Sequence, residues 1–178
     1  MRLTVLVLAS AALAGIATHR ADAQHTQGPA LGIRIGTSGG TRHGSFTAVD
    51  VTGSVMLPWR LGSATGWSLD AKAEATFGSL SGAGNTGLVG SIGPSLALRR
   101  AGFPLYLDGG TSAAFTSERQ FGAKNLGTNI QFISHISVLA QVGSMNTGYR
   151  LQHMSNASLS EHNPGVNQHM LELRYTFR

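Results

Sequence analysis

Apolar and polar residues alternate one by one along most of the chain beyond residue 30. The clearest run is residues 67–78, where odd positions are apolar and even positions are polar or charged. Successive side chains on a strand point to opposite faces, so we expect Asp70, Lys72 and Glu74 to share an inward, salt-bridged face. A soluble sandwich strand with its charges in water is the alternative. Aromatic residues at both ends of the run favour a membrane-crossing strand, which needs about 9–11 residues when tilted.

The same alternation recurs along the chain, and no helical pattern follows the N-terminal segment. We predict eight strands, at residues 31–37, 46–57, 67–78, 87–99, 105–115, 129–140, 149–155 and 167–177. The mean hydropathy is only +0.04, as expected when polar and apolar residues are mixed singly. The predicted fold class is therefore all-β: an eight-stranded antiparallel transmembrane β-barrel of the outer membrane, following a cleaved signal peptide.

Residues 1–23 have the pattern of a secretory signal peptide. Arg2 provides the charged start, residues 3–17 form an apolar core, and Ala21-Asp22-Ala23 is an A-x-A cleavage site. An N-terminal membrane anchor is the alternative, but the apolar run is short for a span. We therefore expect two regions: a signal peptide at 1–23 and one outer-membrane barrel domain at 24–178.

The composition limits the anchors, cofactors and binding partners that we expect for this protein. The chain has no cysteine, which excludes both a disulfide framework and a cysteine-linked lipid anchor. Its net charge of +5 suits an anionic surface such as lipopolysaccharide phosphates, or serves solubility alone. No basic cluster with interleaved aromatic residues points to nucleic acid. The seven histidines form no metal-ligand pattern, so we predict neither a metal nor a cofactor.

Polar residues on the apolar face of the last hairpin need an explanation. His153 and Ser155 share a strand face with tyrosine and leucine, and Asn167 lies on the apolar face of the following strand. With both chain ends in the periplasm, the connection at 156–166 is extracellular. The three side chains would then face the outer leaflet, which in a Gram-negative outer membrane is lipopolysaccharide anchored by lipid A.

This segment resembles a known family. The sequence H-x-S-N-A at 153–157, N-P-G-x-N at 163–167 and the preceding G-Y-R-x-x-H are similar to the lipid A 3-O-deacylase (PagL-type, acyloxyacyl hydrolase) family. The rest of the chain matches that family in pattern rather than in identity. The resemblance implies a carboxylic ester hydrolase of the EC 3.1.1 type. Its substrate would be the 3-O-linked acyl chain of lipid A in lipopolysaccharide.

The resemblance also implies roles. His153 would be the general base, Ser155 the nucleophile and Asn163 the oxyanion-hole donor, with Asn156 in support. Asn167 stands where the family has a glutamate that orients the histidine. An asparagine accepts the imidazole N–H but does not offset the imidazolium charge, which bears on the rate more than on the mechanism.

Four further residues complete this interpretation. Ser158 stands where the family has a small glycine. Glu161, in the loop, is an alternative candidate for the missing carboxylate, His169 is expected to be an interfacial residue, and His135 to face the interior. Asn163-Pro164-Gly165 also fits an ordinary turn.

Two other functions stay open at this point. One is a non-catalytic structural or adhesion barrel, because H-x-S on a strand is often structural. The other is a phospholipase-type acyl hydrolase, since a His-Ser-Asn set is workable chemistry. The expected partner is lipid A in the membrane, without nucleic acid, and the sequence leaves a homodimer open.

Overall fold

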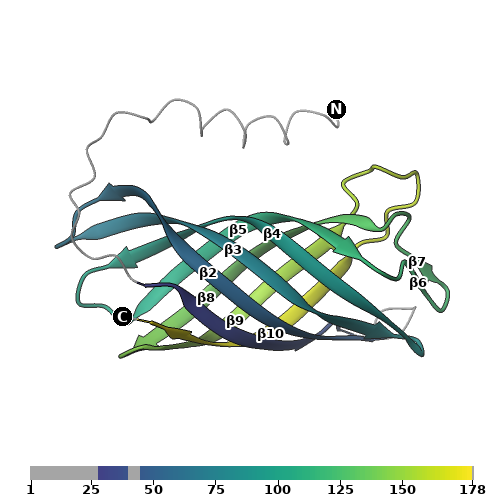
Figure 1. The fold of residues 1–178 in the computed structure, drawn as a ribbon, viewed down its shortest axis with the longest axis horizontal. Helices are drawn as coiled ribbons and strands as arrows, with labels where there is room; N and C mark the ends of the chain where they lie inside the picture. The colour runs from purple at the N-terminus through teal and green to yellow at the C-terminus, as the bar shows by residue number, and fades with distance from the viewer. Residues whose placement is uncertain (1–27, 40–44, 178) are drawn as a thin grey trace.

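The sheet closes on itself. The computed structural model describes residues 28–39 and 45–177, and within them the barrel order is β1-β10-β9-β8-β5-β4-β3-β2 (Figure 1). Every neighbouring pair is antiparallel. The barrel strands are β1 Ala30–Thr37, β2 Phe46–Gly62, β3 Trp67–Gly82, β4 Asn85–Arg100, β5 Leu105–Thr116, β8 Ile130–Val142, β9 Met145–Ser155 and β10 Val166–Thr176. The predicted eight-stranded barrel is confirmed, whereas the predicted signal peptide at 1–23 lies outside the described residues.

Several strands extend further than the sequence predicted. The predicted connection at 58–66 is wrong at its start, because β2 continues to Gly62 after a register shift between Met56 and Arg60. Pro58 lies inside that shift, where a residue without a backbone N–H interrupts the ladder least. The connection between the predicted strands 67–78 and 87–99 shrinks to a two-residue turn between β3 and β4. Backbone pairing continues beyond the apolar belt, since it does not require apolar side chains.

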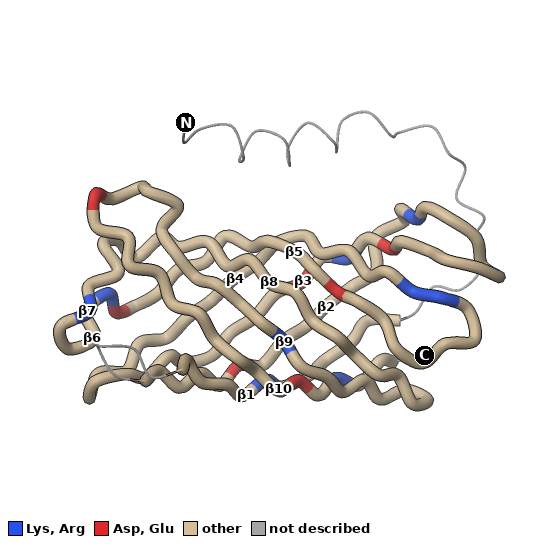
Figure 2. The backbone as a smooth tube through the Cα atoms, turned by 180° about the vertical axis from the view of Figure 1, so that it is seen from behind, with Lys and Arg blue, Asp and Glu red and all other residues tan. Residues whose placement is uncertain are grey.

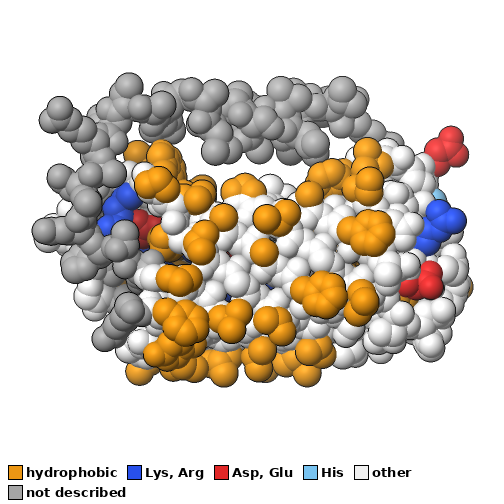
Figure 3. Space-filling model, viewed as in Figure 1, with side chains coloured by type: hydrophobic (Ala, Val, Ile, Leu, Met, Phe, Trp, Pro, Cys, Tyr) orange, Lys and Arg blue, Asp and Glu red, His pale blue; other side chains and the backbone are white. Residues whose placement is uncertain are grey.

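The outer wall of the barrel is apolar. Large hydrophobic side chains lie exposed around it, such as Phe77 at 62%, Leu171 at 65% and Ile92 at 67% (Figure 3). An apolar belt of this kind is stable in lipid and unstable in water. Among the described residues, no helix has the length and hydrophobicity needed to cross a membrane.

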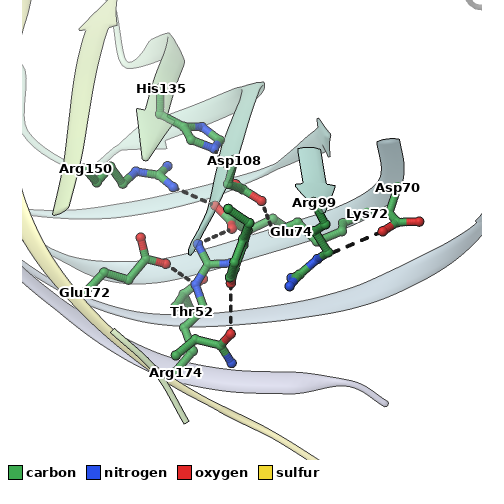
Figure 4. Close-up of polar contacts among 12 residues, drawn as sticks. Thr52, Asp70, Lys72, Glu74, Arg99, Asp108, His135, Arg150, Glu172 and Arg174 are labelled. Atoms are coloured by element: carbon green, nitrogen blue, oxygen red, sulfur yellow. Dashed lines mark hydrogen bonds and ion pairs between the residues drawn. The ribbon is translucent and has the colours of Figure 1, made fainter. Parts of the chain in front are cut away.

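The interior of the barrel is ionic, and Glu74 is at its centre (Figure 4). Its carboxylate contacts Arg34 at 2.7 Å, Arg174 at 3.1 Å and Arg150 at 3.2 Å, with all four side chains buried. Glu172 pairs with Arg34 and Arg174 in the same cluster. A buried charge is tolerated when it is paired in this way.

A second interior group surrounds Asp108. Lys72 and His135 both contact its carboxylate, and Asp70 lies nearby with Arg60. The predictions that Asp70, Lys72 and Glu74 face inward, and that His135 does too, are confirmed. Figure 2 marks the positions of the charged residues along the backbone, in the middle of the strands and at the two ends of the barrel.

The two ends of the barrel differ. Pro29 accepts a backbone hydrogen bond from Phe177 at 2.9 Å, so both ends of the described chain meet at one end, which we name the terminal end. The β9–β10 loop and a short hairpin of β6 Gln120–Phe121 and β7 Lys124–Asn125 lie at the other, which we name the loop end (Figure 1). This hairpin lies between the predicted strands 105–115 and 129–140 and was not predicted.

The β6–β7 hairpin closes the loop end. Phe121 is fully buried and meets the Phe46 ring edge-on at 5.4 Å between centroids. Leu126 is buried in the same apolar cluster. Lys124 lies 5.4 Å from the centre of the Phe46 ring, and burial lowers the pKa of its ammonium group. The lumen is therefore filled by charges in its middle and by apolar side chains at this end.

Replacing Glu74 by alanine should destabilise the barrel by about 3–5 kcal/mol, because three buried arginines lose their shared carboxylate. The midpoint of urea unfolding, followed by tryptophan fluorescence in detergent micelles, measures the change. Glu161→Ala is the matched control, since Glu161 is exposed in the β9–β10 loop. Equal midpoints for the two variants would show that the cluster does not hold the barrel together.

Candidate active site

The residues singled out in the last hairpin lie on the outer wall at the loop end. His153 on β9 is paired in register with Asn167 on β10, and both are exposed. Ser155, two residues beyond His153 on the same face, is half-buried at the end of β9. Gln152 and Met154, the chain neighbours of His153, are buried in the barrel. Strand parity therefore directs the three candidate side chains toward lipid.

A hydrogen bond joins the histidine to the asparagine. His153 Nδ1 lies 2.6 Å from Asn167 Oδ1. An amide oxygen only accepts, so Nδ1 carries the proton and donates it. The other ring nitrogen, Nε2, then presents a lone pair, which is the form of imidazole that accepts a proton.

The hydroxyl of Ser155 makes no hydrogen bond within the described part of the chain. Its distance from His153 along the strand is that of residues i and i+2, about 6.6–6.8 Å between Cα atoms. The register partner of Ser155 on β8 is Phe132, and that of His153 is Ser134, an outward-facing serine. Ser155 thus lies two residues from His153 on the same strand face, and in the described part of the chain no hydrogen bond joins the two side chains.

Gly165 sets the position of the imidazole ring. A Cβ added at Gly165 would lie 2.7 Å from His153 Cε1 and 3.3 Å from His153 Nε2. Its φ of +59° is also one that glycine adopts without strain. The glycine therefore packs against the edge of the ring that carries Nε2. In the sequence Gly165 stands out only as part of N-P-G, which gives no sign of this role.

Asn163 is anchored through its oxygen. Its Oδ1 accepts a hydrogen bond from the backbone N–H of Asn156 at 3.0 Å. Because that N–H only donates, the amide oxygen is fixed at this contact and the NH₂ group is left as a donor. The anchoring N–H belongs to the peptide that follows Ser155, so the Asn163 amide lies next to the candidate nucleophile.

Asn156 is a structural support, with no side-chain donor to spare. It is fully buried, and its Nδ2 donates to the carbonyls of Leu126 at 2.9 Å and His162 at 2.8 Å. Its Oδ1 accepts the backbone N–H of Ser158 at 3.0 Å. The residue thus ties the β9–β10 loop to the segment that follows the β6–β7 hairpin. Of the two expected oxyanion and support residues, only Asn163 retains a free donor.

A tight turn follows Asn156. The N–H of Leu159 donates to the carbonyl of Asn156 at 2.9 Å, and the two central residues, Ala157 and Ser158, have φ of +49° and +66°. Two successive positive φ angles define a type I′ turn, which favours glycine and asparagine. Neither central residue is of that kind, so the turn is strained, as backbones near functional sites often are.

Other expected residues lie around this group. His169 is exposed, and its Nδ1 is hydrogen-bonded to the hydroxyl of Tyr149 on the neighbouring strand. Glu161 is exposed in the loop and makes no ion pair or hydrogen bond with the described residues. In the described part of the chain neither residue is hydrogen-bonded to His153.

The fold and this surface define a class of protein: a transmembrane β-barrel with hydrolase-type side chains on its lipid-facing wall at one rim. Comparison with known families places it within that class. The model of the lipid A 3-O-deacylase (PagL) family matches residues 46–176. The chain belongs to this family.

The chain is also similar to two individual proteins of this kind. A curated relative, the lipid A deacylase PagL of Bordetella bronchiseptica, is 34% identical over 74 residues. That alignment covers 41% of this chain and 40% of the relative, so it spans less than half of either protein. The crystal structure of the outer membrane enzyme PagL has a TM-score of 0.74 at 20% identity, covering 83% of this chain and 99% of the other. At that identity the match shows the fold.

Replacing Gly165 by alanine should lower the rate of acyl release from lipopolysaccharide by about a hundredfold, because the new methyl group displaces the His153 ring. Gly143→Ala is the matched control: Gly143 has a similar φ of +61° but no atom within 4 Å of an added Cβ. Rates measured on purified protein in detergent separate the steric effect from backbone strain. Equal losses in both variants would contradict the positioning role.

Proposed function

We propose that the protein is an outer-membrane serine esterase that removes the 3-O-linked acyl chain of lipid A. The observation that carries the proposal is the hydrogen bond between His153 and Asn167, beside a free Ser155 hydroxyl on the lipid-facing wall. Family membership across residues 46–176 supports the substrate class.

The first half of the reaction makes an acyl-enzyme. His153 Nε2 takes the proton of the Ser155 hydroxyl as Oγ attacks the ester carbonyl. The tetrahedral oxyanion receives a hydrogen bond from the NH₂ group of Asn163, which its fixed oxygen leaves available. The carbonyl then re-forms, the bond between the acyl carbon and the 3-oxygen of the sugar breaks, and the protonated His153 gives its proton to that oxygen, which leaves as the 3-hydroxyl.

The second half releases the fatty acid. Water attacks the acyl-enzyme carbonyl as His153 accepts a proton from it, and the second oxyanion uses the same donor. Collapse of this intermediate breaks the bond to Ser155 Oγ, which takes back the proton from His153. The products are a fatty acid and lipid A with a free hydroxyl at that position.

The substrate reaches this site by lateral diffusion. With the loop end extracellular, Ser155 lies at the level of the outer leaflet, where lipid A has its ester bonds. Tyr149, Leu151, Leu171 and Leu173 are exposed below the candidate triad and provide an apolar wall for acyl chains. No internal pocket is required, since the acyl chains stay in the membrane.

Ser155→Ala should abolish acyl release, with a loss of at least about a thousandfold, because the attacking oxygen is removed. Mass spectrometry of lipid A from cells expressing the variant, compared with wild type, measures it. Ser134→Ala is the matched control, since Ser134 is an outward serine directly across from His153.

The two serines discriminate among alternatives. Full activity in Ser155→Ala with loss in Ser134→Ala would move the nucleophile to β8. Unchanged lipid A with the wild-type protein would favour a non-catalytic barrel, and fatty acid released from phospholipid would favour a phospholipase-type hydrolase.

Asn167→Asp should raise kcat about tenfold, because a carboxylate keeps the hydrogen bond to Nδ1 and also stabilises the imidazolium formed during attack. The same negative charge favours protonation of the ring, so the acid limb of the pH–rate profile should move to higher pH. Asn167→Ala should instead lower kcat without moving that limb upward. An unchanged limb in the aspartate variant would show that residue 167 does not face the base during catalysis.

A further inference from the structure

A cavity of about 240 Å³ lies at the terminal end, far from the candidate triad. It is open to the outside and lies between the β2–β3 turn and the β4–β5 turn, which are joined by a hydrogen bond from Ala101 N–H to the Gly66 carbonyl at 2.9 Å. The side chains that give it chemical character are Arg60, Arg99, Arg100, Ser68, Phe103 and Tyr106. The proposed reaction uses none of them.

The charge of this cavity is unbalanced. Arg60, Arg99 and Arg100 line it, and no lining residue is acidic. Asp70, buried behind it, pairs with Arg60 and lies 4.0 Å from Arg99 Nε, as Figure 4 shows for Arg99. Three guanidinium groups against one carboxylate leave an excess of two positive charges.

Arg99 is held in place by its neighbours. The guanidinium group of Arg99 lies over the Tyr106 ring, 3.6 Å from its centre, and Nη1 donates to Gln141 Oε1 at 3.0 Å. Its side chain is 17% exposed, so its free edge faces the cavity. A planar guanidinium group that is fixed on one face is prepared for bidentate contact with an oxyanion.

The outer rim of the cavity meets lipid. Arg100 lies 5.9 Å from the centre of the Trp67 ring on the outer wall. Trp67 and Phe103 are each 56% exposed, in the manner of the aromatic residues that mark a membrane interface. A cationic cavity thus adjoins an apolar surface at the level of the headgroups.

We propose that this cavity binds the phosphate of an anionic phospholipid from the periplasmic leaflet. The phosphate would lie between Arg60, Arg99 and Arg100, with the glycerol at the rim and the acyl chains outside, along Trp67 and Phe103. A cationic cavity alone suits any small anion, and the adjoining aromatic rim selects one that carries acyl chains. This site is independent of the esterase proposal.

The test uses the full barrel in nanodiscs of phosphatidylcholine containing a minor fraction of phosphatidylglycerol. Native mass spectrometry after release from the nanodisc counts the lipids retained per barrel. Wild type should retain one phosphatidylglycerol in preference to phosphatidylcholine. Arg60→Gln/Arg100→Gln should reduce that retention about tenfold, since two charge-assisted contacts are lost.

Arg119→Gln, an exposed change at the loop end, is the control and should retain the lipid as wild type does. Arg60 pairs with a buried carboxylate, so its loss could prevent the double variant from folding. In that case lipid retention by the single variant Arg100→Gln provides the test. Equal retention in wild type and the arginine variants would overturn the proposal. Displacement of the lipid by equimolar glycerol phosphate would also overturn it, because the site would then take a soluble anion.

Discussion

The ion cluster around Glu74 determines where chemistry can occur in this protein. Three arginines converge on one carboxylate in the middle of the lumen. The Phe46–Phe121 cluster fills the loop end above them. An eight-stranded barrel has an interior just wide enough for side chains, and this one is occupied. A substrate with long acyl chains has no route inside, so any reactive group has to stand on the outer wall.

Polar side chains on the outer wall need hydrogen-bond partners. A polar group in contact with hydrocarbon is costly unless it has a hydrogen-bond partner. His153 meets this condition through Asn167, directly across the β9–β10 ladder, and the same bond fixes the tautomer. Stability and chemistry therefore favour the same arrangement. Both partners lie on paired strands, which hold them more rigidly than a loop would.

The sequence predicted what depends on alternation and missed what depends on contacts between loops. In residues 67–78 the local alternation is enough to predict the inward side chains, because parity alone assigns Asp70, Lys72 and Glu74 to the interior. The support given by Asn156 has no such local signal: its partner at Leu126 lies thirty residues away and offers only a backbone carbonyl. The β6–β7 hairpin that brings this carbonyl into place lacks alternation, so the segment was predicted as a loop. The role of Gly165 likewise appears only from its distance to the His153 ring.

The candidate site thus has two parts of unequal rigidity. The proposed base His153 and its partner Asn167 lie on strands, whereas Asn163, the proposed oxyanion donor, lies on a loop held by Asn156. That loop also contains the strained turn at Ala157 and Ser158. A turn that its own residues disfavour persists only when its surroundings hold it, and Asn156 does so by accepting the Ser158 N–H while bonding two carbonyls. The same buried side chain, Asn156, therefore both links this loop to the segment after the β6–β7 hairpin and holds Asn163, the proposed oxyanion donor.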